Sequence, residues 1–320
     1  MYRFIAIMVI FSFLALPGVA YAQEANQGTV EGQVINGTEG GGSVAGLEIT
    51  LITYVDNAVD ATRAETTDSD GKFRFDNITI GYQHLVSANY MGVHYYNPVV
   101  FEVDEITAYV EVGVCDTTDS DEMIRVQLSH TIIYVEEDSI KITEMFWFVN
   151  DGDRTYTGTD GVLIFTLPEG AADFEAPQEL LSDYQFLDNN RLFYLVPFPP
   201  GERQLVFSFN LAKPDSDELI IPLEINYPTD TYELMVSGED IEVIASQMTP
   251  IEPVTTDSGE QFIHFRDESL PRGTVTDLRL SGLSESGGQF IIVLWTIIAI
   301  IIICTAIYIW KRKKVRNGNE

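Results

Sequence analysis

The carboxyl-terminal region contains an apolar run without a charged residue, from Phe290 to Trp310, and this run constrains the chain more than any other feature. A run of this length can cross a bilayer as one helix. A basic stop-transfer cluster follows at once: Lys311, Arg312, Lys313, Lys314 and Arg316. Because such clusters stay on the cytoplasmic side, we expect a transmembrane helix over 290–310, anchored in membrane lipid, and a cytoplasmic tail over 311–320.

The amino-terminal region predicts export. Arg3 precedes the apolar stretch Phe4 to Leu16, and the small-residue site Ala20-Tyr21-Ala22 follows. This pattern is typical of a secretory signal peptide over residues 1–22. We therefore expect a single-pass protein of the cell membrane, with its amino terminus outside and its carboxyl terminus cytoplasmic.

The expected ectodomain is strongly acidic. Without Arg3, the five tail cations and Glu320, the chain keeps 12 basic residues against 48 acidic ones, a net charge of about −36. This charge excludes nucleic acid as a partner. It leaves open whether the acids serve solubility in a salty exterior or attract cations and basic partners.

The cysteines offer no intrachain disulfide, because Cys115 is alone in the ectodomain and Cys304 lies in the apolar run. A secreted chain without disulfides favours a bacterial or archaeal surface protein.

The ectodomain has the period of β-strands. Apolar residues alternate at Leu47, Ile49 and Leu51 and again from Leu205 to Leu211. In 140–149 the alternation breaks down, which predicts a central strand covered on both faces. The predicted class is all-β: a seven-stranded sandwich, then a larger antiparallel sandwich region, then the one transmembrane helix.

Residues 27–115 contain motifs of a known module. Two strand-like runs, Gly28 to Gly37 and Val44 to Leu51, precede a turn at Asp70-Gly71 and the pair Phe73 and Phe75. We expect this turn to close a hairpin and the two rings to share a face. The segment resembles the carboxypeptidase regulatory-like domain, a transthyretin-like β-sandwich of bacterial and archaeal surface proteins. The resemblance implies an accessory or spacer module without catalysis.

Residues 116–283 predict a second β-sandwich region, either one domain or two subdomains split near 214, followed by a tether over 284–289. Its loops resemble those of uncharacterised membrane-anchored surface proteins that carry the same module. Ten strands are expected, at 123–134, 139–149, 162–167, 191–196, 203–211, 219–225, 232–236, 241–245, 261–265 and 274–280.

No catalytic residue is predicted. Each of the four histidines lacks a Glu three residues on, and neither His-Glu-x-x-His nor Gly-x-Ser-x-Gly occurs. The chain is therefore expected not to be an enzyme.

Two sets of residues are candidate binding sites. Acidic turns supply the oxygen ligands that calcium needs, and the candidates are Asp68, Asp70, Asp116, Asp119, Asp121, Asp151 and Asp153. Solvated turn acids explain the same residues. Exposed rings stack against sugars, and the candidates are Tyr90, Tyr95 and Tyr96, which core packing explains equally.

The sequence thus predicts a non-catalytic, membrane-anchored surface protein that binds an extracytoplasmic protein or glycan. A structural or assembly accessory subunit of a membrane complex is the alternative, and a secreted-side hydrolase is a third possibility.

Overall fold

The computed structural model describes residues 26–283 apart from 160, 188–189 and 239–240. This part of the chain is all-β, as predicted, and its helical structure is one short 3-10 helix, η1 (Gln178–Asp183). The predicted signal peptide, tether, transmembrane helix and basic tail lie outside the described residues. Between residues 26 and 283, no helix has the length and apolarity that a membrane span requires.

The chain divides into two compact units. Among the described residues, the first consists of 26–35, Val44–Asn89 and His94–Val112, and the second consists of Asn36–Ser43, Tyr90–Val93 and the residues from Gly113 to Leu283. The predicted boundary between Cys115 and Asp116 falls shortly after Val112.

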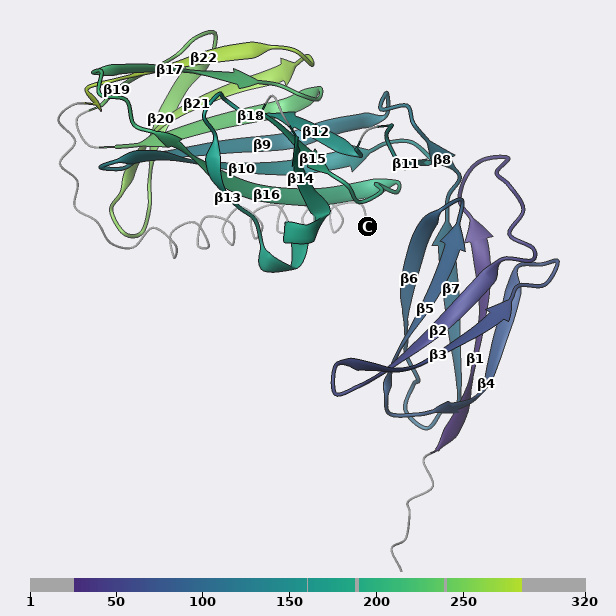
Figure 1. The fold of residues 1–320 in the computed structure, drawn as a ribbon. Helices are drawn as coiled ribbons and strands as arrows, with labels where there is room; N and C mark the ends of the chain where they lie inside the picture. The colour runs from purple at the N-terminus through teal and green to yellow at the C-terminus, as the bar shows by residue number, and fades with distance from the viewer. Residues whose placement is uncertain (1–25, 160, 188–189, 239–240, 284–320) are drawn as a thin grey trace, which may run out of the picture. The chain divides into compact units, whose positions relative to one another are not determined.

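Residues 27–114 form seven strands in two sheets (Figure 1). One sheet has the order β4-β1-β7 and the other the order β3-β2-β5-β6. The strands are β1 (Gln27–Asn36), β2 (Glu48–Val55), β3 (Ala58–Thr66), β4 (Lys72–Thr79), β5 (Gln83–Tyr90), β6 (Val93–Val99) and β7 (Thr107–Val114).

Period-two burial explains these strands. In β7, residues from Ala108 to Val114 alternate between buried and exposed, and Phe73 and Phe75 of β4 are both buried with ring centroids 6.0 Å apart. One face of β4 and one face of β7 therefore supply the core, whereas every residue of the edge strand β3 is exposed. The shared face of the two Phe residues is as predicted.

The expected hairpin at Asp70-Gly71 is wrong. The turn joins β3 to β4, but β3 pairs with β2 and β4 pairs with β1. Gly71 adopts φ +77°, which suits glycine, so the turn itself is real. It carries the chain from one sheet to the other, a crossing that local sequence does not distinguish from a hairpin.

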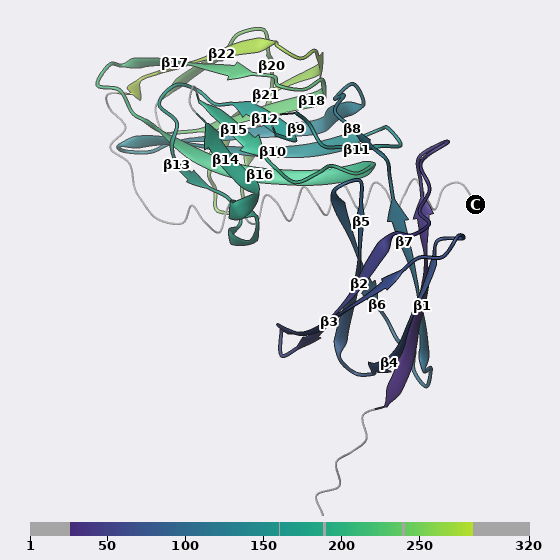
Figure 2. The same cartoon turned by 45° about the vertical axis from the view of Figure 1, so that its right-hand side comes forward.

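A seven-stranded sheet of order β13-β16-β10-β9-β18-β21-β20 forms the base of the second unit (Figure 2). Its strands are β9 (Ile124–Val135), β10 (Ser139–Asn150), β13 (Ala172–Glu175), β16 (Gly201–Ala212), β18 (Thr229–Ser237), β20 (Thr249–Thr255) and β21 (Gln261–Leu270). The β10 strand is an interior strand between β16 and β9, as its apolar sequence predicts.

A second layer faces this sheet and consists of two separate three-stranded sheets, β12-β15-β14 and β17-β22-β19. Their strands are β12 (Leu163–Thr166), β14 (Tyr184–Leu187), β15 (Arg191–Tyr194), β17 (Glu218–Glu224), β19 (Glu242–Ala245) and β22 (Val275–Ser281). Short strands β8 (Thr117–Thr118) and β11 (Thr155–Tyr156) pair in parallel.

One hydrophobic core fills the space between the layers. Its buried members run from Ile124 to Leu283 and include Phe148, Phe207 and Leu278. Residues on both sides of position 214 therefore share this core. A smaller buried cluster, with Ile132, Met145 and Phe262, lies on the opposite face of the seven-stranded sheet.

Candidate functional site

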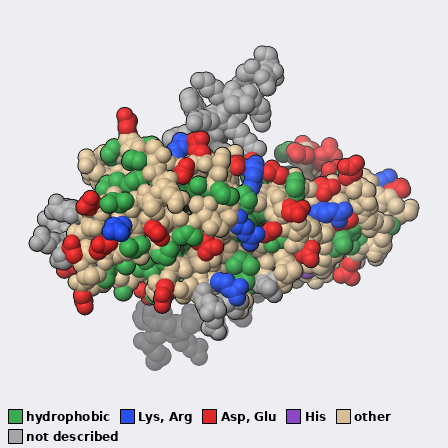
Figure 3. All heavy atoms as spheres, turned by 90° about the horizontal axis from the view of Figure 1, so that it is seen from above, with side chains coloured by type: hydrophobic (Ala, Val, Ile, Leu, Met, Phe, Trp, Pro, Cys, Tyr) green, Lys and Arg blue, Asp and Glu red, His purple; other side chains and the backbone are tan. Residues whose placement is uncertain are grey.

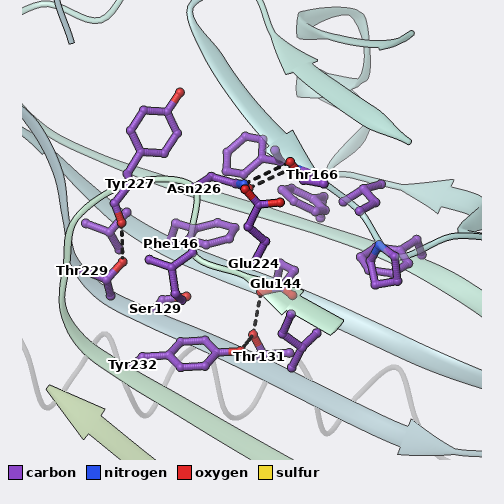
Figure 4. A pocket seen from close by; sticks show the side chains of 18 residues that line it. Ser129, Thr131, Glu144, Phe146, Thr166, Glu224, Asn226, Tyr227, Thr229 and Tyr232 are labelled. Carbon is purple, nitrogen blue, oxygen red and sulfur yellow. Dashed lines mark hydrogen bonds between the residues drawn. The ribbon is translucent and has the colours of Figure 1, made fainter. Parts of the chain in front are cut away.

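A cavity of about 40 Å³ opens between the seven-stranded sheet and the split second layer (Figure 4). A space of this size has room for a few waters or a small polar group. It is lined by Val126, Ser129, Thr131, Glu144, Phe146, Phe165, Thr166, Leu167, Pro168, Phe207, Phe209, Leu223, Glu224, Ile225, Asn226, Tyr227, Thr229 and Tyr232.

The floor of the cavity carries a chain of hydrogen bonds that ends on a carboxylate. The Thr131 hydroxyl donates to Glu144 Oε2 at 2.8 Å, and the same hydroxyl lies 2.9 Å from the Tyr232 hydroxyl. Because the Thr131 proton is directed at the carboxylate, Tyr232 acts as the donor to Thr131. Strand register produces this chain, since Thr131 of β9 is the cross-strand partner of Glu144 in β10.

Burial alters the ionisation of this floor. It raises the pKa of Glu144 from 4.5 to about 7, and the Thr131 hydrogen bond opposes the shift only in part. Burial also raises the pKa of Tyr232, and the nearby Glu144 carboxylate adds to that effect. Glu144 is therefore poised between its neutral and charged forms near neutral pH, while Tyr232 stays protonated.

Aromatic rings form the walls. Phe146 and Phe207 come from the seven-stranded sheet and Phe165 comes from β12 of the second layer. The Phe165 ring centroid lies 5.1 Å from those of Phe146 and Phe207. The walls thus offer ring faces and edges above a single carboxylate.

The mouth of the cavity lies at a seam between the two small sheets, where the edge strands β12 and β17 contribute lining residues. Side chains join this seam. Asn226 Oδ1 accepts from the Thr166 amide at 2.9 Å, and the Tyr227 hydroxyl accepts from the Ile164 amide at 2.9 Å. Asn226 Nδ2 also donates to the Thr166 hydroxyl (Figure 4). These side-chain hydrogen bonds hold the two small sheets together beside the cavity, where no backbone hydrogen-bond ladder joins β12 to β17.

Carboxylates and hydroxyls are the reactive groups of the cavity lining. Among the described residues that line it there is no Lys, Arg, His or Cys, and its acidic groups are Glu144 on the floor and Glu224 at the mouth. A hydroxyl nucleophile needs an adjacent base and a group that orients that base. On the floor the Thr131 hydroxyl donates to Glu144, and among the described residues no further group orients that carboxylate.

A second carboxylate lies on the opposite face of the same sheet. Glu233 of β18 has Oε2 3.4 Å from Nε2 of both His130 and His264, and Arg266 approaches its Oε1 at 3.7 Å. The hydrogen bond from His130 is the main cause that lowers the pKa of Glu233, ahead of the opposing effect of burial. This cluster joins β9, β18 and β21 with an ionised group.

The residues predicted to bind calcium mostly contact protein donors. The Asp68 carboxylate accepts from the amides of Asp70 and Lys72, Asp121 pairs with Arg272 at 2.6 Å, and Asp151 pairs with Arg125 at 2.6 Å. Asp70 lies 3.8 Å from the Lys72 ammonium, and Asp119 is exposed.

Within the second unit, Asp116 and Asp153 come together around a cation of the chain. Arg154 lies 3.5 Å from Asp116 and 3.9 Å from Asp153. Hydrogen bonds from Asn36, Gly42 and Tyr90 lower the pKa of Asp116. In the described ranges no group of three or more His, Cys, Asp or Glu side chains is arranged to hold a metal ion.

The three predicted glycan-stacking tyrosines differ in exposure. Tyr90 is 6% exposed and donates to Asp116 at 2.8 Å, so its ring face is not available for stacking. Tyr95 is half-buried. Tyr96 is 54% exposed and stacks on the exposed His94 at 6.0 Å, and Asn89 lies 3.1 Å from His94 Nε2.

Sequence reasoning missed the cavity residues. One signal was present: Glu144 lies in the segment 140–149, which predicts a strand covered on both faces, and a carboxylate on a covered face is unusual. Nothing local in the sequence pairs it with Thr131 or Tyr232, because their neighbourhood arises from strand order.

Comparisons with known proteins add little to this geometry. No family model matches the chain, and no curated protein matches it. A solved structure from Parabacteroides distasonis ATCC 8503, described as a putative protease, is similar at 8% identity with a TM-score of 0.33. The match covers 51% of this chain and 41% of that one, so the chain spans less than half the length of that structure.

Proposed function

We propose that this protein is a non-catalytic surface module that recognises an extracytoplasmic protein, and that the cavity above Glu144 is its recognition site. The observation that carries the proposal is the seam in the second layer, which opens directly over a carboxylate without a cationic neighbour in the described lining. A carboxylate partly removed from water without a countercharge is unfavourable for folding, so its retention in a core strand favours a binding role.

Size argues against the hydrolase alternative. A glycosidase needs a sugar ring between its two carboxyl groups. Glu144 and Glu224 do line one cavity, but its enclosed space of about 40 Å³ is small for a hexose. A side chain of a protein partner fits this volume.

The charge of the chain supports a basic partner. The chain has 49 acidic and 18 basic residues. Acidic side chains are spread over the face shown in Figure 3, with few Lys and Arg among them. Several described arginines already pair with acids of the chain itself. Arg125 pairs with Asp151, and Arg272 pairs with Asp121. Arg279 pairs with Glu218. An acidic field of this kind attracts basic proteins over several ångströms of solvent.

Display outside the cell is part of the proposal and rests on the sequence. The apolar run 290–310 and its basic cluster support a single span, and residues 1–22 support export. Digestion of intact cells that carry an epitope tag after Gln23, ahead of β1, tests this directly. External protease should remove the tag, and a tag that is protected until the cells are lysed would contradict the orientation.

Binding is tested with the full-length protein in lipid nanodiscs, applied to a random peptide array and to a glycan array. We expect peptide signals that Ser129→Leu, which fills the cavity, removes and that Ile220→Ser, an exposed change on β17, preserves. If neither array is bound, the recognition role is wrong. If Ser129→Leu leaves peptide binding intact, the cavity is not the site.

A glycan ligand is the second candidate, favoured by the exposed His94–Tyr96 stack beside Asn89. Aromatic faces with a polar neighbour suit sugar rings. Glycan signals that disappear with Tyr96→Ala and persist with Ser129→Leu would place recognition on the first unit. An accessory role in a membrane complex would instead show as partner association that depends on residues 290–310.

A further inference from the structure

The cavity provides a negative charge in a small enclosure but supplies no positive one. Glu144 sits on the floor with the Thr131 hydroxyl 2.8 Å away, and Glu224 lies at the mouth. The described lining contributes two carboxylates and no cation. An occupant that brings a positive charge would pair with Glu144 and relieve the cost of its burial.

The walls suit the same occupant. Phe146, Phe165 and Phe207 surround the approach to Glu144 with mutual centroid distances between 5.1 and 5.9 Å. Ring faces attract cations, and the attraction increases when the cation is desolvated. Apolar walls also accept the methylene stem of a long side chain while its charged head reaches the carboxylate.

Size and hydrogen-bonding capacity select the kind of cation. The enclosed space of about 40 Å³ is small, which favours a compact ammonium head over a planar guanidinium with its five donors. The Thr131 hydroxyl lies beside the carboxylate and the Ser129 hydroxyl also lines the cavity, and both oxygens can accept from an ammonium group.

From these observations we infer that the cavity binds a primary ammonium group on an alkyl stem, as on a lysine side chain of a protein partner. This inference rests on the proposed binding role of the cavity and specifies its ligand. An ammonium group in place would favour the charged form of Glu144, so binding releases protons near neutral pH. The other titratable groups in the lining are Glu224, Tyr227 and Tyr232, and both tyrosines stay neutral because burial raises their pKa values.

Titration calorimetry of the full-length protein in nanodiscs tests this inference, with n-butylammonium chloride as probe and 1-butanol as its neutral match. At pH 8 we expect butylammonium to bind at least about tenfold more tightly than butanol, as charge-assisted hydrogen bonds require. Glu144→Gln should reduce this preference to about twofold or less, and Glu144→Asp should retain part of it. Glu224→Gln, a matched change at the mouth, should keep most of it.

Several results would overturn the inference. Equal affinity for the two probes would make the site an apolar pocket, and a preference that survives Glu144→Gln would place the ammonium site elsewhere. Loss of all preference in Glu144→Asp as well as in Glu144→Gln would also overturn it, provided that the circular dichroism spectra of both variants match that of the parent chain. Peptide signals without dependence on lysine would end this inference while the recognition role survived, whereas silent arrays and no probe binding would end both.

Discussion

Glu144 and Glu233 lie in the same seven-stranded sheet and face opposite sides of it, and their environments differ in one decisive respect. Glu144 is surrounded by hydroxyls and rings, and burial raises its pKa to about 7. Glu233 is contacted by two histidines and an arginine, and its pKa is lowered. Both side chains are partly enclosed, so depth alone does not set the charge of a carboxylate. The hydrogen-bond donors that neighbouring strands place beside a carboxylate set its charge.

This difference separates a structural carboxylate from a functional one. Glu233 joins three strands through partners that the chain itself provides. Glu144 lacks such a partner among the described residues of its cavity and is suited to accept one from another molecule. Substituting Gln for each of the two carboxylates should therefore change the free energy of unfolding in opposite directions.

The largest effect is expected at Glu233. Glu233→Gln leaves His130, His264 and Arg266 without their shared anion, and we expect a loss of about 3 kcal/mol in the free energy of unfolding at pH 7. Because the pKa of Glu233 is lowered, its contribution is present above its ordinary value and is lost as pH falls through the folded value. Urea unfolding followed by Trp147 fluorescence measures the loss. An unchanged midpoint at pH 7 would mean that the two faces do not differ.

Glu144→Gln should instead increase the free energy of unfolding above neutral pH. Between pH 4.5 and 7 the folded state keeps a proton on Glu144 that the unfolded state has lost, so stability falls as pH rises through this window. Gln removes this decrease. The variant should match the parent at pH 4 and exceed it by about 2 kcal/mol at pH 8, a value reduced for partial solvent access. Urea unfolding at pH 4, 6 and 8 measures it, and equal pH profiles would contradict the raised pKa.

Thr131→Val tests the hydrogen-bond chain on the cavity floor. It removes the donor to Glu144 and the acceptor for Tyr232, and we expect a loss of about 1.5 kcal/mol because a buried hydroxyl is left unpaired. The pKa of Glu144 should rise further. The carboxyl carbon shift of Glu144, followed by NMR against pH, reports that rise, with Thr143→Val on the opposite face as the matched control. A pKa that falls would contradict the assigned donor.

Asn226→Ala should loosen the seam at a cost of about 1 kcal/mol or less, since its partner Thr166 is close to solvent. Amide exchange should accelerate at Thr166 more than at Ile164, whose acceptor is Tyr227. Equal protection in variant and parent would show that the seam does not depend on this side chain.

Calcium is expected to have the smallest effect. Most predicted acids already contact arginines or backbone amides, so we expect thermal unfolding of the full-length chain to shift by about one degree or less between calcium and chelator. A rise of several degrees, reversed by chelator, would establish a site that these contacts do not reveal.

The sequence predicted much of the strand content but little of the site. All ten strands expected after Asp116 are present, because their apolar periods survive in the packed structure. β20 was missed because Pro250 and Pro253 argue against a strand, although an edge strand tolerates them. The pairing of β4 with β1 and the approach of Tyr232 to Thr131 depend on strand order, which local sequence does not encode.

The edge strand β20 affects how copies of this protein interact at high local concentration. All but one of its seven residues are exposed, and at two of them proline offers no amide donor. A register shift between Ile251 and Val254 interrupts the strand further. Such an edge is a poor template for a strand from a neighbouring molecule. Crowded copies of this protein are thereby discouraged from polymerising through the end of their largest sheet.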